Sequence, residues 1–300
     1  MAIDAPKLRL PSLKALQAFE TAARHESFSR AAEELSVTPG AVAQQVKALE
    51  DWLGFPLFRR QSHGLQLLPQ AKAALPGLVR AFDSLGDSVQ DLRNAGPVRQ
   101  IRIAALPCIA QLWLSPRLPQ LRHHFPDLQI SVTAMETPPN FRREPYDLAL
   151  FYLNSDCDDP ARLVLAQDYL FPVCSPALVK ELELTEGLLE EQPLLADAVW
   201  AQDWPSWMKF AGLNPDKATI SASFSLYSLA LQTAIDGGGL LIGRETLVTN
   251  ALQRKDVIAP FNIRLPSPRP LTLIMPTPLT EGHRLAELVE WFKKSVGTQA

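Results

Sequence analysis

The chain has 300 residues, a hydrophobic share of 47% and a formal net charge of −3 at pH 7. That length suits two or three compact domains, and the composition is sufficient for buried cores. No apolar run approaches the length of a membrane helix, and the first residues lack the apolar segment of a signal peptide. The three cysteines form no paired framework, which favours a reducing compartment. We therefore expect a globular cytoplasmic protein with no membrane partner.

Charge is distributed unevenly along the chain. Residues 1–80 hold ten Lys and Arg against seven Asp and Glu, whereas the rest of the chain holds nineteen against twenty-five. A mildly basic N-terminal part joined to an acidic remainder suggests that only the first part meets the phosphates of a nucleic acid.

The segment 27–60 predicts two short helices separated by a tight turn, with a basic hairpin after them. Thr38 suits the N-cap of the second helix, Pro39 suits its first position and Gly54 suits its C-cap. The exposed face of this second helix carries small, amide and cationic side chains and no acid. Such a face is suited to the major groove of double-stranded DNA.

A β-hairpin is expected next, because apolar and polar residues alternate on both sides of the turn at 62–64. Its basic side chains would reach flanking phosphate or the minor groove; the alternative is an ordinary solvated surface. The side chains that we predict to contact DNA are Ser29, Arg30, Thr38, Pro39, Gly40, Ala43, Gln44, Gln45, Lys47, Arg59, Arg60 and His63.

A long helix is predicted over 69–95, with a hinge at 94–97. Its apolar residues recur at alternating intervals of three and four, which is the seam of a coiled coil. The simplest cover for such a seam is a second copy of the chain, and the alternative is the downstream part of the same chain. The predicted dimerisation residues are Leu75, Leu78, Phe82, Leu85, Val89 and Leu92.

From residue 101 onward, short apolar strands alternate with helices, which predicts an α/β sheet with helices on both faces. The expected strands are 101–106, 130–135, 147–152, 240–243 and 271–275. An extended run over 163–174 is expected to cross between two lobes. The expected helices are 112–125, 226–236 and 282–296.

The N-terminal motifs resemble one family. Ser27–Leu35, Val37–Thr38, Ala41–Val42, Leu49–Glu50 and Pro56–Arg60 closely resemble the winged helix-turn-helix of LysR-type transcriptional regulators. The downstream pattern resembles the two-lobed, periplasmic-binding-protein-like effector domain of the same family. The segments 203–212 and 230–244 are similar to a subgroup related to the glycine-cleavage activator. In this chain Gln44 stands where many members have arginine, so we expect a preference for adenine there.

The resemblance implies both an architecture and a function. The overall class is α/β, and the parts are an all-α winged helix-turn-helix at 1–68, a linker and dimerisation helix at 69–96, and an effector-binding domain at 97–300. Within that domain, lobe I is expected at 98–164 plus 269–300 and lobe II at 165–268. The implied function is sequence-specific transcriptional regulation by a homodimer or homotetramer, controlled by a small molecule and exerted on RNA polymerase.

We find no catalytic or metal-binding pattern in the sequence. Gly237–Gly239 follows a predicted helix, whereas phosphate loops follow a strand, so we interpret it as a helix cap. His123–His124 has no further ligands at metal spacing, and Cys174–Pro176 is not a nucleophile elbow. We therefore expect no enzyme activity, no metal and no cofactor. The rival hypothesis is a solute-binding or sensor protein of the periplasmic-binding-protein type.

The effector site is expected between the lobes, at the carboxyl ends of strands. In the family, Ser or Thr often stands where this chain has Pro107–Ile109, so hydroxyl donors for a carboxylate are missing. We therefore predict a small, partly apolar or aromatic effector rather than a simple dicarboxylate, although each aromatic residue also suits ordinary core packing. The predicted effector-binding residues are Pro107, Cys108, Ile109, Thr137, Phe151, Tyr152, Phe224, Ser225 and Tyr227.

Overall fold

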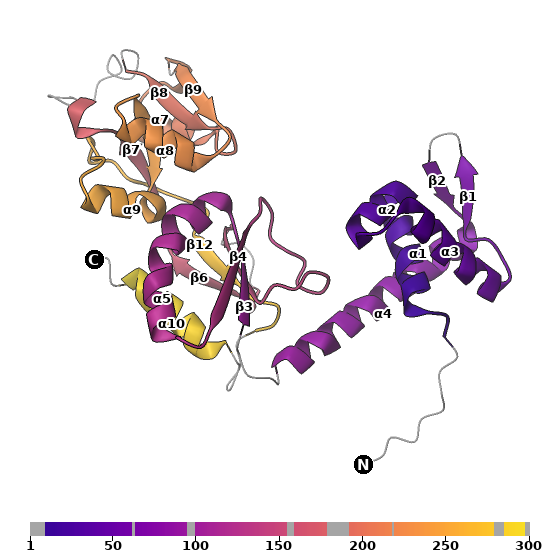
Figure 1. Cartoon of the computed structure of the whole chain (residues 1–300). Helices are drawn as coiled ribbons and strands as arrows, with labels where there is room; N and C mark the ends of the chain where they lie inside the picture. Colours follow the sequence, from indigo (N-terminus) through magenta and orange to yellow (C-terminus); the bar gives the residue numbers. More distant parts are fainter. Residues whose placement is uncertain are drawn as a thin grey trace. The chain divides into compact units, whose positions relative to one another are not determined.

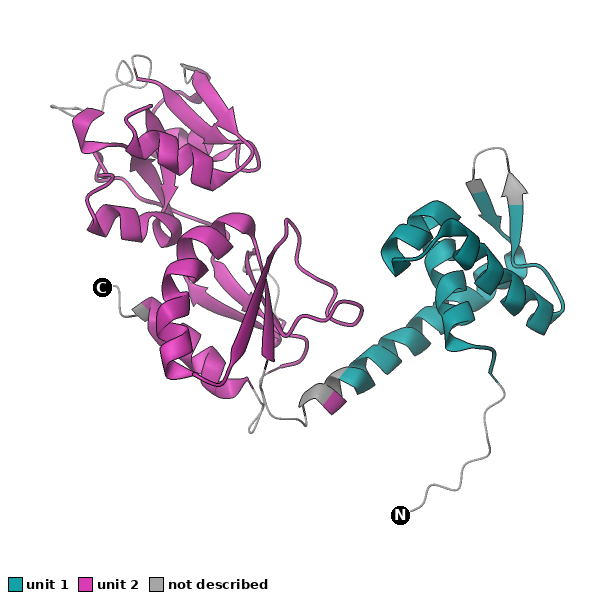
Figure 2. Ribbon diagram, viewed as in Figure 1, with its two compact units in different colours: residues 1–89 teal, residues 90–300 magenta. Residues whose placement is uncertain are grey.

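The computed structural model of the chain describes residues 10–61, 64–94, 100–154, 159–178, 192–217, 219–278 and 285–297. The chain forms two compact units, residues 1–89 and residues 90–300 (Figure 2). Among the described helices, none combines the length and apolar character that crossing a membrane requires.

The first unit begins with three helices, α1 (Leu13–His25), α2 (Phe28–Leu35) and α3 (Pro39–Leu53). Each helix begins after a hydroxyl residue, Ser12, Ser27 or Thr38, whose side chain accepts a backbone N–H of the first turn. Fully buried alanines, including Ala22 and Ala31, allow the helices to approach closely. The predicted caps and both helices of the motif are thus confirmed.

The wing is an antiparallel hairpin of β1 (Phe58–Gln61) and β2 (Gly64–Leu67), as predicted (Figure 1). The Glu50 carboxylate on α3 accepts the N–H of Leu57 at 2.7 Å and ties the start of the hairpin to the helix. The ring of Phe58 packs on those of Phe19 and Phe28, with centroids 5.7 and 5.8 Å apart. These contacts fix the wing against the three-helix core.

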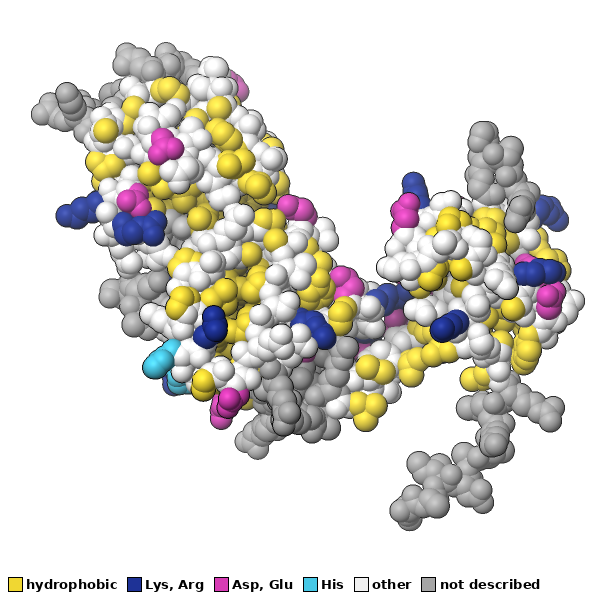
Figure 3. Space-filling view, in the orientation of Figure 1, with side chains coloured by type: hydrophobic (Ala, Val, Ile, Leu, Met, Phe, Trp, Pro, Cys, Tyr) yellow, Lys and Arg dark blue, Asp and Glu magenta, His cyan; other side chains and the backbone are white. Residues whose placement is uncertain are grey.

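The long helix α4 (Pro69–Asn94) confirms the predicted helix, but its apolar residues have two different environments. Ala71 is buried in the core of the first unit, and Leu75 and Leu78 pack against that core. Leu85, Val89 and Leu92 are exposed, by 44%, 44% and 76%. The hydrophobic surface of α4 is visible in Figure 3. The predicted hinge lies mostly outside the described residues, which resume at Gln100.

The second unit contains two five-stranded sheets, one in each lobe. The lobe I sheet has the order β4-β3-β5-β12-β6 and consists of β3 (Gln100–Ala105), β4 (Gln129–Ala134), β5 (Leu148–Tyr152), β6 (Arg162–Ala166) and β12 (Leu271–Ile274). The lobe II sheet has the order β11-β7-β10-β8-β9 and consists of β7 (Tyr169–Val173), β8 (Leu194–Asp197), β9 (Ile220–Phe224), β10 (Leu240–Arg244) and β11 (Leu265–Pro266). In each lobe three strands run parallel, which brings their carboxyl ends to one edge.

Helices cover both faces of the lobe II sheet. In the described residues of the second unit the α-helices are α5 (Leu118–His124), α7 (Asp203–Phe210), α8 (Tyr227–Ile235), α9 (Glu245–Gln253) and α10 (Ala286–Gly297). On β10, Leu241 packs in the core that includes α8, whereas Ile242 packs in the core that includes Trp207 of α7. This alternation follows from the two-residue period of a strand.

The expected helix over 112–125 is less regular than predicted. The chain forms a π-helical turn, η1 (Ile109–Leu114), then a 3-10 turn, η2 (Ser115–Arg117), and only then α5. Pro116 and Pro119 lack the N–H groups that a continuous α-helix needs, which explains the interruption. Short 3-10 turns also occur at η3 (Pro176–Leu178) and η4 (Pro215–Lys217).

Two chain segments cross between the lobes, and the extended run over 163–174 predicts the first of them. One joins β6 to β7 and the other joins β11 to β12. They are held together where the N–H of Ser267 donates to the Asp168 carbonyl at 2.9 Å, and the Gln167 side chain donates to the Ser267 carbonyl at 2.7 Å. Gly237–Gly239 is confirmed as a helix end: Gly237 has φ +86°, and a Cβ on Gly239 would lie 2.2 Å from the Pro193 carbonyl.

Candidate DNA-binding surface and effector site

The N-terminal half of α3 presents the predicted DNA-binding face. Thr38, Pro39, Gly40, Gln44 and Lys47 are exposed. The face also includes Ala43 and Gln45, which are half-buried, while Ser29 and Arg30 on α2 and Arg59 on β1 are exposed. The side chain of Arg60 and the whole of His63 lie outside the described part of the structure.

An acid interrupts the α3 face that the sequence predicts to be acid-free. The Lys47 ammonium lies 2.9 Å from the Asp51 carboxylate, one helical turn further along, and both side chains are largely exposed. Hydrogen bonding to Asp51 raises the pKa of Lys47, so this lysine stays charged. For Lys47 to contact a phosphate, it must exchange this partner for the DNA.

A charged cluster connects α1 to α2. The Arg24 guanidinium donates to Glu34 at 2.8 Å and to Glu20 at 3.4 Å, and His25 also contacts Glu34. The hydrogen bond from Arg24 lowers the pKa of Glu34 to about 2. These contacts link the two helices and add only modest stability, because solvent weakens exposed ion pairs.

A small cavity of about 20 Å³ lies where strands from both lobes end. Its walls come from the segments after β3, β4, β8 and β9. Its lining residues are Leu106, Pro107, Cys108, Glu136, Asp197, Val199, Trp200, Ser225, Leu226 and Tyr227. This is the crevice at strand carboxyl ends where α/β proteins commonly bind ligands.

Four of the predicted effector-binding residues line this cavity: Pro107, Cys108, Ser225 and Tyr227. A fifth, Tyr152, contacts Trp200 edge to face, with ring centroids 5.7 Å apart.

The other four predicted residues are not among the lining residues. Ile109 is fully buried in the core, and Thr137 is exposed one position beyond Glu136. Phe151 belongs to a separate core cluster because neighbouring residues of a strand point to opposite faces, so only Tyr152 is directed to the cleft. Phe224 is half-buried, and its carbonyl accepts the N–H of Ala198 at 2.8 Å.

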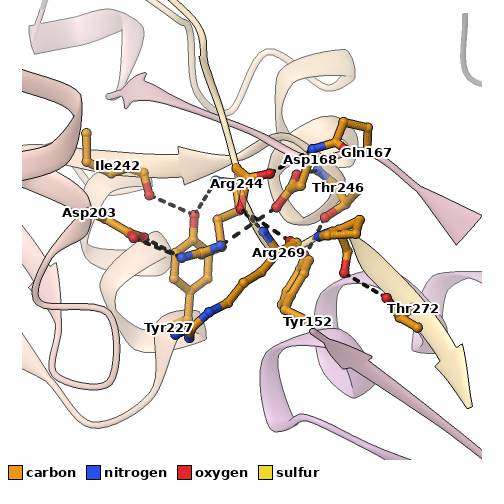
Figure 4. A network of polar contacts seen from close by, with 12 residues as sticks. Tyr152, Gln167, Asp168, Asp203, Tyr227, Ile242, Arg244, Thr246, Arg269 and Thr272 are labelled. Atoms are coloured by element: carbon orange, nitrogen blue, oxygen red, sulfur yellow. Dashed lines mark hydrogen bonds and ion pairs between the residues drawn. The ribbon is translucent and has the colours of Figure 1, made fainter. Parts of the chain in front are cut away.

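A buried ionic network that the sequence analysis did not identify surrounds Arg244 at the end of β10 (Figure 4). One nitrogen, Nη2, donates to both carboxylate oxygens of Asp203, at 2.9 and 2.7 Å. The guanidinium carbon lies 3.7 Å from the centroid of the Trp200 ring. The backbone N–H of Arg244 donates to the Tyr227 hydroxyl at 3.0 Å. An arginine that ends an otherwise apolar strand was the signal available in the sequence, since buried arginines are rare unless paired.

The network joins the two lobes. Asp168, in the crossover between β6 and β7, accepts the N–H of Thr246 at 3.0 Å, in the first turn of α9. Thr246 also shares a hydrogen bond with the hydroxyl of Tyr152 in lobe I. Burial raises the pKa of Asp168 to about 6 although Arg244 and Thr246 oppose that rise. Asp203 and Asp197 also have raised pKa values, mainly through burial.

The two cysteine thiols that the structure describes show no sign of activation. Cys108 and Cys174 are buried, and Cys157 lies outside the described residues. Burial raises the pKa of Cys108 to about 12 and that of Cys174 to about 11. Within the described segments there is no group of three or more His, Cys, Asp or Glu side chains placed to hold a metal ion.

A winged helix-turn-helix followed by a two-lobed α/β domain defines a DNA-binding regulator with a ligand-binding domain. Residues 13–72 match the bacterial regulatory helix-turn-helix model of the lysR family, and residues 94–297 match the LysR substrate binding domain. The chain belongs to the LysR family of transcriptional regulators. A solute-binding protein without a role in transcription is not favoured.

Relatives agree with this assignment, and a solved structure shares the fold. The chain is 32% identical to the glycine cleavage system transcriptional activator of Escherichia coli (strain K12), over 94% of this chain and 93% of that protein. It is 33% identical to the HTH-type transcriptional regulator TrpI of Pseudomonas aeruginosa, over 96% of this chain and 98% of that protein. Both relatives are transcriptional regulators. The structure of CrgA, a LysR-type regulator from Neisseria meningitidis, shares the fold with a TM-score of 0.54 and 19% identity, covering 96% of this chain and all of that chain.

Proposed function

We propose that two copies of the chain bind an interrupted inverted repeat in DNA, with each α3 in a major groove. The observation that carries this proposal is the exposed polar face of α3, which its N-cap and the underlying alanine core hold in place. The wing contacts flanking phosphates. The working parts are the DNA-binding segment 1–68, the dimerisation segment 69–96 and the effector-binding segment 97–300.

Gln44 is proposed to read an adenine, because a side-chain amide pairs with the N6 and N7 edge of that base. Gln44→Ala should therefore relax base preference at one position in each half-site, by about 1–3 kcal/mol of discrimination. Binding of the full chain to a set of operator variants, measured by fluorescence anisotropy, tests this role. Unchanged discrimination in the variant would remove Gln44 from base recognition.

Lys47 and Arg59 are proposed to contact phosphate rather than bases. Replacing either with alanine should weaken binding to all sequences and reduce the slope of log affinity against log salt by about one. Lys209→Ala, an exposed lysine on α7, is the matched control and should leave that slope unchanged. An unaltered slope for the Lys47 and Arg59 variants would place both outside the interface.

The cavity between the lobes is proposed to receive the effector. A ligand changes the arrangement of subunits only if it binds the two arrangements with different affinity. A site whose walls come from both lobes meets that requirement, because its shape depends on how the lobes are arranged. The test is a metabolite screen on the full chain, read out as a shift in thermal stability and as a change in the DNA footprint. If compounds bind without any change in the footprint, the cavity does not control DNA binding.

The remaining partner, the cellular location and the lack of catalysis follow from this role. We propose contact with RNA polymerase once the protein is bound at a promoter, action in the cytoplasm where the chromosome lies, and no catalytic activity. The regulatory roles of the relatives support each of these statements. Transcription in vitro from purified components, with and without the chain, tests the contact with RNA polymerase.

A further inference from the structure

Arg244 has hydrogen-bonding capacity that its neighbours do not use. A guanidinium carries five N–H groups, and Nη2 of Arg244 donates to both oxygens of Asp203, at 2.9 and 2.7 Å. The Nε and Nη1 atoms are buried and have no hydrogen-bond partner among the residues that the structure describes. A carboxylate oxygen of Asp168 lies 3.9 Å from Nη1, which is close enough for an ion pair and too far for a hydrogen bond. Three buried N–H groups of a charged side chain therefore lack an acceptor, which is unfavourable.

This guanidinium lies beside the cavity between the lobes. Trp200 lines the cavity, and its ring covers the guanidinium, with 3.7 Å between the ring centroid and the guanidinium carbon. Cys108 and Asp197 also line the cavity. Burial raises the pKa of Cys108 to about 12 and also raises that of Asp197, and the positive charge of Arg244 opposes both rises. The charge of the guanidinium therefore acts on groups in the cavity wall.

The N-terminus of α8 gives the cavity a second positive feature. Ser225, Leu226 and Tyr227 line the cavity, and α8 begins at Tyr227 and has nine residues. Leu226, at the N-cap position, makes no side-chain hydrogen bond to the helix. The N–H groups of a first turn carry partial positive charge and bind anions. Because the Tyr227 hydroxyl accepts the backbone N–H of Arg244 at 3.0 Å, the first residue of α8 is in direct contact with the arginine.

The acids near the cavity do not supply the missing acceptor. Asp203 and Asp168 face the guanidinium, and Arg269 also acts electrostatically on Asp203 (Figure 4). The Oδ1 atom of Asp197 accepts two backbone N–H groups of its own turn, at 2.7 and 3.2 Å. Glu136 is exposed, so water and salt weaken its repulsion of an anion. The free N–H groups call for an acceptor from outside the protein, and a carboxylate is the strongest common acceptor for a guanidinium.

We propose that the effector carries a carboxylate, which accepts hydrogen bonds from the free N–H groups of Arg244 beside the N-terminus of α8. This inference rests on the proposed function, because it assumes that the cavity is the effector site. The cavity of about 20 Å³ holds about one water molecule, so the half-buried Trp200 ring moves off the guanidinium when the ligand binds. The rest of the ligand then lies against Leu106 and Leu226, which favours a single carboxylate on an apolar group.

The test compares ligands that share a body and differ in the acceptor. Propionate, propionamide and propanol form one matched set, and benzoate, benzamide and benzyl alcohol form a second. Isothermal titration calorimetry on the full chain should show, in at least one set, that the carboxylate binds at least about tenfold more tightly than the alcohol, with the amide between them. Carboxylates that bind no better than their alcohols in both sets, or no binding by all six compounds, overturn the inference.

Movement of Trp200 gives a signal that a purely structural ring would not give. The better-binding carboxylate should change the tryptophan emission of the full chain, and Trp200→Phe should lose most of that change while it still binds the ligand. An emission change that is undiminished in Trp200→Phe would contradict the displacement of this ring and, with it, the access of the ligand to Arg244.

Variants of exposed residues keep the test independent of folding. Ser225→Asp adds a negative charge beside the end of α8 and should weaken carboxylate binding by about tenfold, whereas Glu136→Gln removes a repulsive charge and should tighten it by about threefold. Ser131→Asp and Asp127→Asn change exposed residues that do not line the cavity, and as controls they should leave the affinity unchanged. Arg244→Lys keeps the charge and loses the planar group, so a folded variant should lose the preference for carboxylates. Unchanged affinity in both Ser225→Asp and Glu136→Gln would contradict the assignment.

The two levels of the argument fail separately. If a neutral metabolite changes the DNA footprint while the carboxylates do not bind, the effector function stands and the carboxylate assignment is wrong. If carboxylates bind with the predicted selectivity and the footprint never changes, the cavity is a carboxylate site that does not regulate DNA binding.

Discussion

Arg244, Asp203 and Asp168 come from separate elements of the effector domain, and their charges meet where the two lobes join. Asp203 lies on α7, Arg244 at the end of β10, and Asp168 in a crossover segment. Removing one partner from a buried ion pair leaves a charge without compensation and commonly costs about 3–5 kcal/mol. We interpret this network as the fixed end of the interlobe contact, because Arg244 and Asp168 are only 3% and 0% exposed.

Asp168 gives the network a defined pH dependence. Its pKa is raised from the usual 3.8 to about 6 by burial. A raised pKa in the folded state means that this group contributes stability below the unfolded-state pKa and loses it as the pH rises through about 6. The free energy of unfolding of the full chain should therefore fall by roughly 3 kcal/mol through this group across that interval.

Asp168→Asn should flatten this dependence, because the amide does not titrate and retains an oxygen for the Thr246 N–H. The measurement is the free energy of unfolding of the effector domain in urea, followed by tryptophan fluorescence of the full chain at several pH values. Asp127→Asn provides the exposed control. Parallel pH profiles for wild type and Asp168→Asn would show that Asp168 does not titrate as stated.

Asp51 is predicted to weaken DNA binding. It holds Lys47 at 2.9 Å and places a negative charge beside the proposed phosphate contact. Asp51→Ala should tighten binding to all sequences by about threefold to tenfold, equivalent to roughly 1 kcal/mol, at moderate salt. Binding titrations with specific and random duplexes test the prediction, with Asp127→Ala as control. Equal affinities for wild type and Asp51→Ala would show that this end of α3 lies away from the backbone of the DNA.

At the scale of elements, helix α4 shows what the spacing of apolar residues can predict and what it cannot. The interval of three and four residues predicts one continuous seam, and the helix itself is confirmed. The pattern does not distinguish apolar residues that pack on the core of the first unit from apolar residues that are exposed to solvent. Leu75 and Leu78 pack on the core of the first unit, so a charge at Leu78 would damage the DNA-binding module itself.

The exposed part of α4 provides a cleaner test of dimerisation. Leu85→Asp combined with Val89→Asp places two charges where we propose that a second copy packs, and burying an unpaired charge is strongly unfavourable. Analytical ultracentrifugation should show a shift to smaller species. Ser84→Asp, which adds a charge on the same helix but off the seam, should leave the mass unchanged. An unchanged mass for the double variant would show that α4 is not the dimer contact.

Features encoded by neighbouring residues could be predicted, and features assembled over long distances could not. Thr38 and Gly54 identify the ends of α3 because capping depends on a few adjacent residues. The Arg244 network joins residues 41 and 78 positions apart, so its acids could not be assigned before the fold was known. Trp200 was missed because it lies in an irregular turn after β8, outside any periodic pattern.

At the scale of the whole molecule, a DNA-binding unit and a two-lobed unit are combined in one chain. The lobes share a continuous hydrophobic core that includes Leu150 of one sheet and Leu241 of the other. Small displacements in the cleft are therefore transmitted to packed elements rather than absorbed, because well-packed interiors deform little. This property makes the effector domain suitable for altering the arrangement of subunits on DNA.

The central claim is that two symmetric copies of the chain read two half-sites, and selection of DNA by the full-length protein from a random pool tests it most directly. The selected sequences should contain an interrupted inverted repeat whose half-site centres are separated by whole turns of the double helix, about 10 base pairs or a multiple of that. Footprinting should then protect both half-sites equally. Selection of a single asymmetric half-site, or of no sequence in preference to others, would contradict this account.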